Sequence, residues 1–173
     1  MRTYAVCAGN PRAEENIARA LKMFVGDGLP VFVCIGTDAV SGDSLGPLIG
    51  TLLERKLRGK TYVFGTLERP LTARDVNVSA EFVKKICPCG KVVAIDAAVG
   101  RKEEVGGVRI SDSPVKPGLG VNKNLSDTGD VSIIGIVDEK KDSGEGGNLG
   151  RVRFSLVYKI AETVAGGIER FFA

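Results

Sequence analysis

Four acidic residues each follow an apolar segment that has the pattern of a buried strand: Asp38, Asp43, Glu68 and Asp96. The carboxyl ends of parallel strands meet at one edge of a sheet, so we expect these side chains to share that edge. Carboxylates that are brought together repel one another and resist the loss of water unless they share a proton or a cation. The sequence therefore predicts either acid–base chemistry or cation binding at this edge.

Both kinds of chemistry remain open for Asp43 and Asp96. If the two groups share a proton, one carboxylate can activate water while the other donates a proton. If they bind a divalent cation, the ion can polarise a carbonyl or activate water, and all-oxygen ligands favour a hard cation over zinc. We expect no other cofactor.

Simpler structural explanations exist for the same two residues. Asp43 precedes a helical pattern and is well placed to cap the helix, which is the favoured interpretation if Asp43 is taken alone. Asp96 could be a loop residue that binds nearby amides. That explanation is weaker, because Asp96 follows an apolar run and should be partly buried. Only the pairing of the two aspartates favours chemistry.

The chain of 173 residues contains no histidine, which excludes catalysis by Ser-His-Asp or Cys-His groups. A general acid or base must therefore be a carboxylate, Lys, Tyr, Cys or water. Cys87-Pro88-Cys89 is at most half of a zinc motif, and we interpret it as a turn. The glycines after the strand at 31–36 lack the spacing and the lysine of a nucleotide-binding loop.

Composition limits the partners and the location of the protein. The net charge is +3, the basic residues are scattered and Trp is absent, so we expect no nucleic-acid partner. No apolar run approaches the roughly 20 residues that span a membrane, and the N-terminus does not have the pattern of a signal peptide. We therefore expect a cytoplasmic protein without a membrane partner, and homo-oligomerisation is left open.

The elements that must position the acidic residues alternate between strand and helix. Continuous apolar runs predict strands and 3.6-residue spacing predicts helices: strands over 31–36, 61–65, 92–97 and 131–137, and helices over 13–25, 44–57, 73–87 and 151–172. Val105–Ser111 has the pattern of an edge strand, and Thr3–Ala8 is either a short strand or irregular. The pattern predicts one α/β domain over residues 1–173, with a parallel sheet and right-handed crossovers.

A long connection rich in Gly, Pro, Asp and Asn occupies residues 112–130. Loops of this length in compact domains are usually functional or disordered. The simpler interpretation of PVKPGLGVNKN, residues 114–124, is a turn-rich connector. The functional interpretation is a binding loop in which Lys123 stabilises a developing oxyanion.

Four segments, taken together and in order, resemble the YyaC family of sporulation proteins, often called spore proteases. The segments span about residues 31–137: CIGTDAVSGDSLGPLIGTLL, VFGTLERPL, VVAIDAAVGR and PVKPGLGVNKNLSDTGDVSIIGIV. That family is similar to the germination protease of spore formers and, more remotely, to nickel-hydrogenase maturation endopeptidases. The resemblance implies a three-layer α/β/α sandwich around a mostly parallel sheet, of the phosphorylase/hydrolase-like type.

The resemblance also implies an aspartate-dependent peptidase in which Asp43 and Asp96 are catalytic. The residues that we expect around the pair to bind substrate are Thr37, Asp38, Glu68, Gly118 and Lys123, although Asp38 could instead be a third ligand or a turn residue. Because the maturation enzymes recognise metal with a further histidine, nickel dependence is not carried over to this chain. The implied substrate is a protein or peptide, such as a small spore protein in the sporulating cell or forespore. A non-catalytic binding protein on the same fold, or a metal-dependent hydrolase, are the alternatives.

Overall fold

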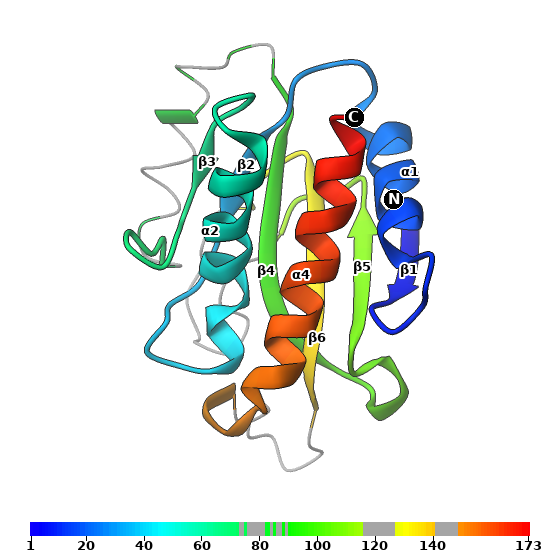
Figure 1. Ribbon diagram of the computed structural model, residues 1–173, viewed down its shortest axis with the longest axis vertical. Coiled ribbons are helices and arrows are strands. Elements are labelled where there is room, and N and C mark those ends of the chain that lie inside the picture. Colours follow the sequence, from blue (N-terminus) through cyan, green and yellow to red (C-terminus); the bar gives the residue numbers. More distant parts are fainter. Residues whose placement is uncertain are drawn as a thin grey trace.

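The computed structural model describes residues 1–72, 75, 82, 83, 85, 88, 90–115, 127–140 and 149–173. Its strands form one sheet in the order β1-β5-β6-β4-β2-β3, and Figure 1 shows α1, α2 and α4 together on one face of that sheet. The strands are β1 (Thr3–Cys7), β2 (Val31–Cys34), β3 (Val63–Phe64), β4 (Val92–Gly100), β5 (Gly107–Ser111) and β6 (Val131–Glu139). The α-helices are α1 (Ala13–Val25), α2 (Leu45–Leu57) and α4 (Phe154–Phe171), and the 3-10 turns are η1 (Gly42–Ser44), η2 (Lys102–Glu104) and η3 (Leu149–Arg151).

The sheet is mostly parallel, which confirms the predicted α/β class. Strand β2 pairs in parallel with β3 and β4, and β4 pairs in parallel with β6. Strand β5 runs antiparallel to both of its neighbours, β1 and β6. The prediction that residues 105–111 form an edge strand is wrong, because Thr3–Cys7 pairs with β5 and becomes the edge itself.

The helices follow the predicted spacing closely. Helix α1 has the predicted bounds, whereas α2 begins at Leu45 because the turn η1 precedes it. Strand β4 continues to Gly100, three residues beyond the predicted end. Most of the helix expected over residues 73–87 lies outside the described residues, as do Cys87 and Cys89.

Each face of the sheet has its own apolar core, because successive strand residues point to opposite faces. Phe32, Ile95 and Ile133 are buried under α1, α2 and α4 in the larger cluster. On the opposite face a smaller cluster contains Val33 and Ala94, and Val83 is buried with them. The alternation along β4 places Asp96 on the same face as Ala94.

Two glycines allow α2 to lie directly against the end of β2. A Cβ atom on Gly46 would lie 2.0 Å from the carbonyl oxygen of Ile35. A Cβ atom on Gly36 would lie 2.0 Å from the carbonyl oxygen of Asp43, and Gly36 has a φ of +142°. The start of the helix therefore rests on the end of the strand by contact of backbone with backbone, and this contact fixes the position of η1.

Among the described residues, no helix combines the length and the apolar character needed to cross a membrane.

Replacing Gly46 by Ala tests this contact. Alanine is the better helix former by roughly 1 kcal/mol. We nevertheless expect Gly46→Ala to lower the free energy of unfolding by about 2–3 kcal/mol, because the added methyl group overlaps the Ile35 carbonyl. Urea unfolding measures the change.

Gly28→Ala is the matched control, because a Cβ atom on Gly28 meets no atom within 4 Å. We expect that substitution to change stability by less than about 0.5 kcal/mol. Equal unfolding curves for the two variants would show that α2 does not depend on the close contact with Ile35.

Candidate active site

Asp43 lies in η1, where the contact with Gly36 holds it over the end of β2. The side chain is half-buried, and its Oδ2 accepts a hydrogen bond from the backbone N–H of Thr37 at 3.1 Å. The residue at the N-cap of α2 is Ser44, and no side chain caps this helix. The interpretation of Asp43 as a helix cap is therefore wrong, because its carboxyl binds the loop that leaves β2.

Asp96 lies inside β4, at the position where β2 ends beside it. The N–H of Ile35 donates to the carbonyl oxygen of Ile95 at 2.7 Å, and on the other side Asp96 pairs with Ile134 of β6. The side chain is only 8% exposed, and its Oδ1 accepts a hydrogen bond from the N–H of Ala97 at 2.8 Å. Asp96 is thus a strand residue with a buried carboxyl, not a loop residue.

Burial raises the pKa of both carboxyls. The pKa of Asp96 rises to about 7, first because of burial and also because of the negative charge of Asp43, while the hydrogen bond from Ala97 opposes the rise. Burial also raises the pKa of Asp43, and the hydrogen bond from Thr37 opposes it. The turn η1, which carries Asp43, contacts β4, which carries Asp96, and the charge of Asp43 acts on Asp96.

This arrangement suits acid–base chemistry at neutral pH. Asp43 is the more exposed carboxyl, so it loses its proton first, and its charge then helps Asp96 to keep a proton. Two carboxyls whose surroundings separate their pKa values can act as base and acid in one reaction.

The other predicted site residues differ in where they lie relative to the aspartate pair. Thr37 donates its backbone N–H to Asp43, and Asp38 is exposed in the turn beside it. Glu68 is exposed in the loop after β3, a strand that β2 separates from β4. Gly118 and Lys123 lie outside the described residues.

The segment that contains Gly118 and Lys123 has described ends. Val115 and Thr128 form a bridge, and the N–H of Asp130 donates to the carbonyl oxygen of Val92, at the start of β4. Both ends of the segment therefore lie toward the sheet edge opposite to the carbonyl ends of the parallel strands. The prediction that this segment forms part of the site stays a prediction.

The expectation of a divalent metal ion at the carboxylates stays a prediction. Among the described residues, no group of three His, Cys, Asp or Glu side chains could hold a metal ion. An ion at the aspartate pair would therefore take most of its oxygen ligands from water or substrate. We therefore derive no step through a metal.

Arg109 of β5 was missed by sequence reasoning. Its Nε is buried and has no hydrogen-bond partner among the described residues. The only sequence signal is a single charged residue inside the alternating strand Gly107–Ser111, a pattern that is more typical of a solvent-facing position.

The raised pKa of Asp96 predicts how stability depends on pH. The folded state binds the carboxyl proton of Asp96 more tightly than the unfolded state does. The stability that this protonation contributes is therefore complete below about pH 4 and is lost as the pH rises through 7. Asn cannot ionise, so we expect Asp96→Asn to match the wild type near pH 4. Above pH 7 we expect the variant to be more stable, by up to about 4 kcal/mol for a shift of about three pKa units.

Chemical unfolding at pH 4 and at pH 8.5 measures this difference. Asp27→Asn is the control, because Asp27 is exposed in the turn after α1. If Asp96→Asn and Asp27→Asn show the same dependence on pH as the wild type, Asp96 is not a carboxyl with a raised pKa.

Comparison with known proteins identifies a similar fold and the family of the chain. A [NiFe] hydrogenase maturation protease, HycI from Thermococcus kodakarensis KOD1, has a similar fold, with a TM-score of 0.56 and 19% identity over 90% of this chain and 97% of that chain. The uncharacterized protein YyaC of Bacillus subtilis (strain 168) is 41% identical over 141 residues, which cover 80% of this chain and 67% of that protein. The family model described as "Protein of unknown function (DUF1256)" matches residues 6–167. The chain therefore belongs to the DUF1256 family.

Proposed function

We propose that this protein is a peptidase that hydrolyses a peptide bond with Asp43 and Asp96. The observation that carries the proposal is the buried carboxyl of Asp96, whose pKa of about 7 leaves it able to donate a proton at neutral pH. The neighbouring Asp43 is more exposed and can act as the base. The similarity of the fold to a maturation protease supports the choice of a peptide bond as the target.

In the proposed reaction, the ionised Asp43 removes a proton from a water molecule that attacks the carbonyl carbon of the peptide bond. The protonated Asp96 donates a hydrogen bond to the carbonyl oxygen during this attack, and it transfers its proton to the nitrogen as the carbon–nitrogen bond breaks. The products are a carboxylic acid and an amine, and transfer of the water-derived proton from Asp43 to Asp96 returns the pair to its starting state. No histidine is needed, which fits a chain that has none.

We place the substrate at the carboxyl edge of the sheet, beside the pair. Strand β2 ends next to Ile95, so the loop at Gly36-Thr37 rather than a strand lies beside Asp96. We assign Thr37 to holding Asp43 in place through its N–H. Asp38 and Glu68, both exposed, are assigned to the flanks of a bound peptide, and Gly118 and Lys123 to its cover and to the oxyanion.

The proposed biological setting is sporulation, with a small spore protein as substrate in the cytoplasm of the sporulating cell or forespore. Support comes from the resemblance to a family of sporulation proteins and from the 41% sequence identity to YyaC. This setting is separate from the chemistry, and the reaction can be tested without it.

Cleavage by purified protein tests the proposal. We expect the wild type to cut a small protein isolated from spores, with mass spectrometry to identify the new termini. Asp43→Asn and Asp96→Asn should each slow cleavage at least about 100-fold, because each removes one member of an acid–base pair.

Asp27→Asn makes the same chemical change at an exposed position outside the site, and it should cleave at the wild-type rate. Equal rates in all three variants would rule out the aspartate mechanism. Tight binding of the spore protein without any cleavage by the wild type would indicate a binding protein on a protease-like fold.

A further inference from the structure

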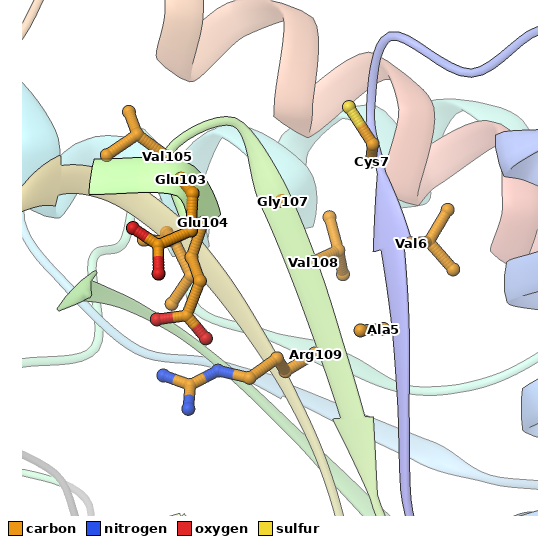
Figure 2. Close-up of a pocket in the computed structure, with 10 residues that line it drawn as sticks. Ala5, Val6, Cys7, Glu103, Glu104, Val105, Gly107, Val108 and Arg109 are labelled. Atoms are coloured by element: carbon orange, nitrogen blue, oxygen red, sulfur yellow. The ribbon is translucent and has the colours of Figure 1, made fainter. Parts of the chain in front are cut away.

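A second feature lies on the sheet away from the aspartate pair. A pocket of about 210 Å³ opens between β1, η2, β5 and β6 (Figure 2). We call it the Arg109 pocket. Its lining combines apolar and charged groups, among them Ala5, Val105, Ile136, Glu104 and Arg109. Pockets that hold whole small-molecule ligands usually measure about 300–1,000 Å³, so this one fits part of a larger ligand.

Arg109 lines this pocket and carries a hydrogen-bond donor without an acceptor among the described residues. Its Nε is buried, and no described residue accepts a hydrogen bond from it. Figure 2 shows the side chain reaching from β5 toward the side of the pocket where Glu104 lies. Because buried donors are nearly always satisfied in folded proteins, the Nε–H calls for an acceptor that the described part of the chain does not supply.

The nearby glutamates are occupied elsewhere. Glu103 and Glu104 each form an ion pair with Arg101 at 3.3 Å. Glu104 also accepts a hydrogen bond from the backbone N–H of Arg101 at 2.9 Å. Arg101 therefore holds both carboxylates, although Arg109 lies close enough for its charge to lower the pKa of Glu104 as a minor cause after Arg101.

The strand register connects the Arg109 pocket to the aspartate pair. Arg109 pairs with Ile134 of β6, and Ile134 pairs with Asp96 of β4. Paired residues point to the same face, so Arg109 and Asp96 share a face two strands apart. Their Cα atoms are thus roughly 10 Å apart, the length of about three residues of extended peptide.

The Arg109 pocket also lies toward the same sheet edge as Asp96. The turn η2, which contributes Glu104, directly follows the carboxyl end of β4. A peptide that runs along this edge from the aspartates would reach the Arg109 pocket with a residue about three positions from the bond that is cut.

We propose that the Arg109 pocket binds a carboxylate carried by a short aliphatic group of a peptide. A carboxylate is the acceptor that matches the Nε–H of a guanidinium best, and the apolar lining accommodates the aliphatic part. The carboxylate is either the C-terminus of the peptide or an acidic side chain. Binding stands on the Arg109 pocket alone, whereas its use as a specificity subsite rests on the proposed peptidase function.

Nuclear magnetic resonance of the Arg109 Nε–H signal tests the binding directly. N-acetylleucine carries a terminal carboxylate, and the α-amide of N-acetylglutamate carries a side-chain carboxylate. We expect at least one of them to shift the signal and to bind at least about tenfold more tightly than its uncharged partner, N-acetylleucinamide or the α-amide of N-acetylglutamine. The acid that binds identifies the source of the carboxylate.

Substitutions of Arg109 test whether this side chain, and not positive charge elsewhere on the surface, binds the carboxylate. Arg109→Met should weaken binding of the acid at least about tenfold, and Arg109→Lys should weaken it as well, because it keeps the charge but lacks the Nε–H. Arg55→Met, on the exposed surface of α2, should bind like the wild type. Equal binding of acids and amides, or unchanged binding in both Arg109 variants, would overturn the proposal.

The same titration in Asp96→Asn keeps the two proposals distinguishable. Binding of the acid by Asp96→Asn, with no cleavage by the wild type, would refute only the peptidase function. Cleavage by the wild type without any preference for a carboxylate would refute only the role of the Arg109 pocket.

Discussion

The burial of the Asp96 carboxyl is the constraint on which the proposed chemistry and the pH dependence of stability both depend. A carboxylate in the interior of a sheet loses its hydration, and a second aspartate nearby makes ionisation harder still. The pKa of Asp96 rises to about 7 as a result, which turns an ordinary acid into one that can donate a proton in neutral solution. The same burial weakens the folded state above pH 7, so the chain carries a cost in stability that a neutral side chain would avoid.

The rest of the fold sets the geometry around this group. Strand β4 runs beyond the end of β2, which buries Asp96 in the sheet yet leaves a loop, not a strand, at its side. The backbone contacts at Gly36 and Gly46 hold η1 and α2 against that end of β2, so Asp43 is placed by rigid elements. The proposed acid–base role of the pair requires this kind of support, because small displacements reduce catalysis strongly.

Local patterns explain why so much of the fold could be predicted. The 3.6-residue spacing of apolar residues located α1 and α2, and the continuous apolar runs located β2, β4 and β6. The rule that parallel strands end at one edge of a sheet predicts that Asp43 and Asp96 share that edge, and η1 does contact β4. The same rule predicts that Asp38 and Glu68 lie at the carboxyl edge of the sheet. Their exposure to solvent, however, depends on the geometry of their loops.

Features that depend on distant contacts were harder to predict. The segment Thr3–Cys7 pairs with β5 more than 100 residues later, so nothing local marks β5 as an interior strand. Asp43 has a residue type and position typical of a helix cap, and only the fold turns its carboxyl toward Thr37. Arg109 has the sequence pattern of a surface residue, and only the assembled sheet shows that its Nε is buried without an acceptor from the residues that the structure describes.

The ionisation of Asp96 can be followed directly by carbon-13 nuclear magnetic resonance of aspartate carboxyl groups, in the wild type and in Asp43→Asn. We predict that Asp96 titrates near pH 7 in the wild type and at a lower pH in Asp43→Asn, where the neighbouring charge is absent. Removal of the Asp43 charge should lower the pKa of Asp96 by less than burial raises it, because burial is the larger cause. Titration of Asp96 near pH 4 in the wild type would contradict the account of the aspartate pair.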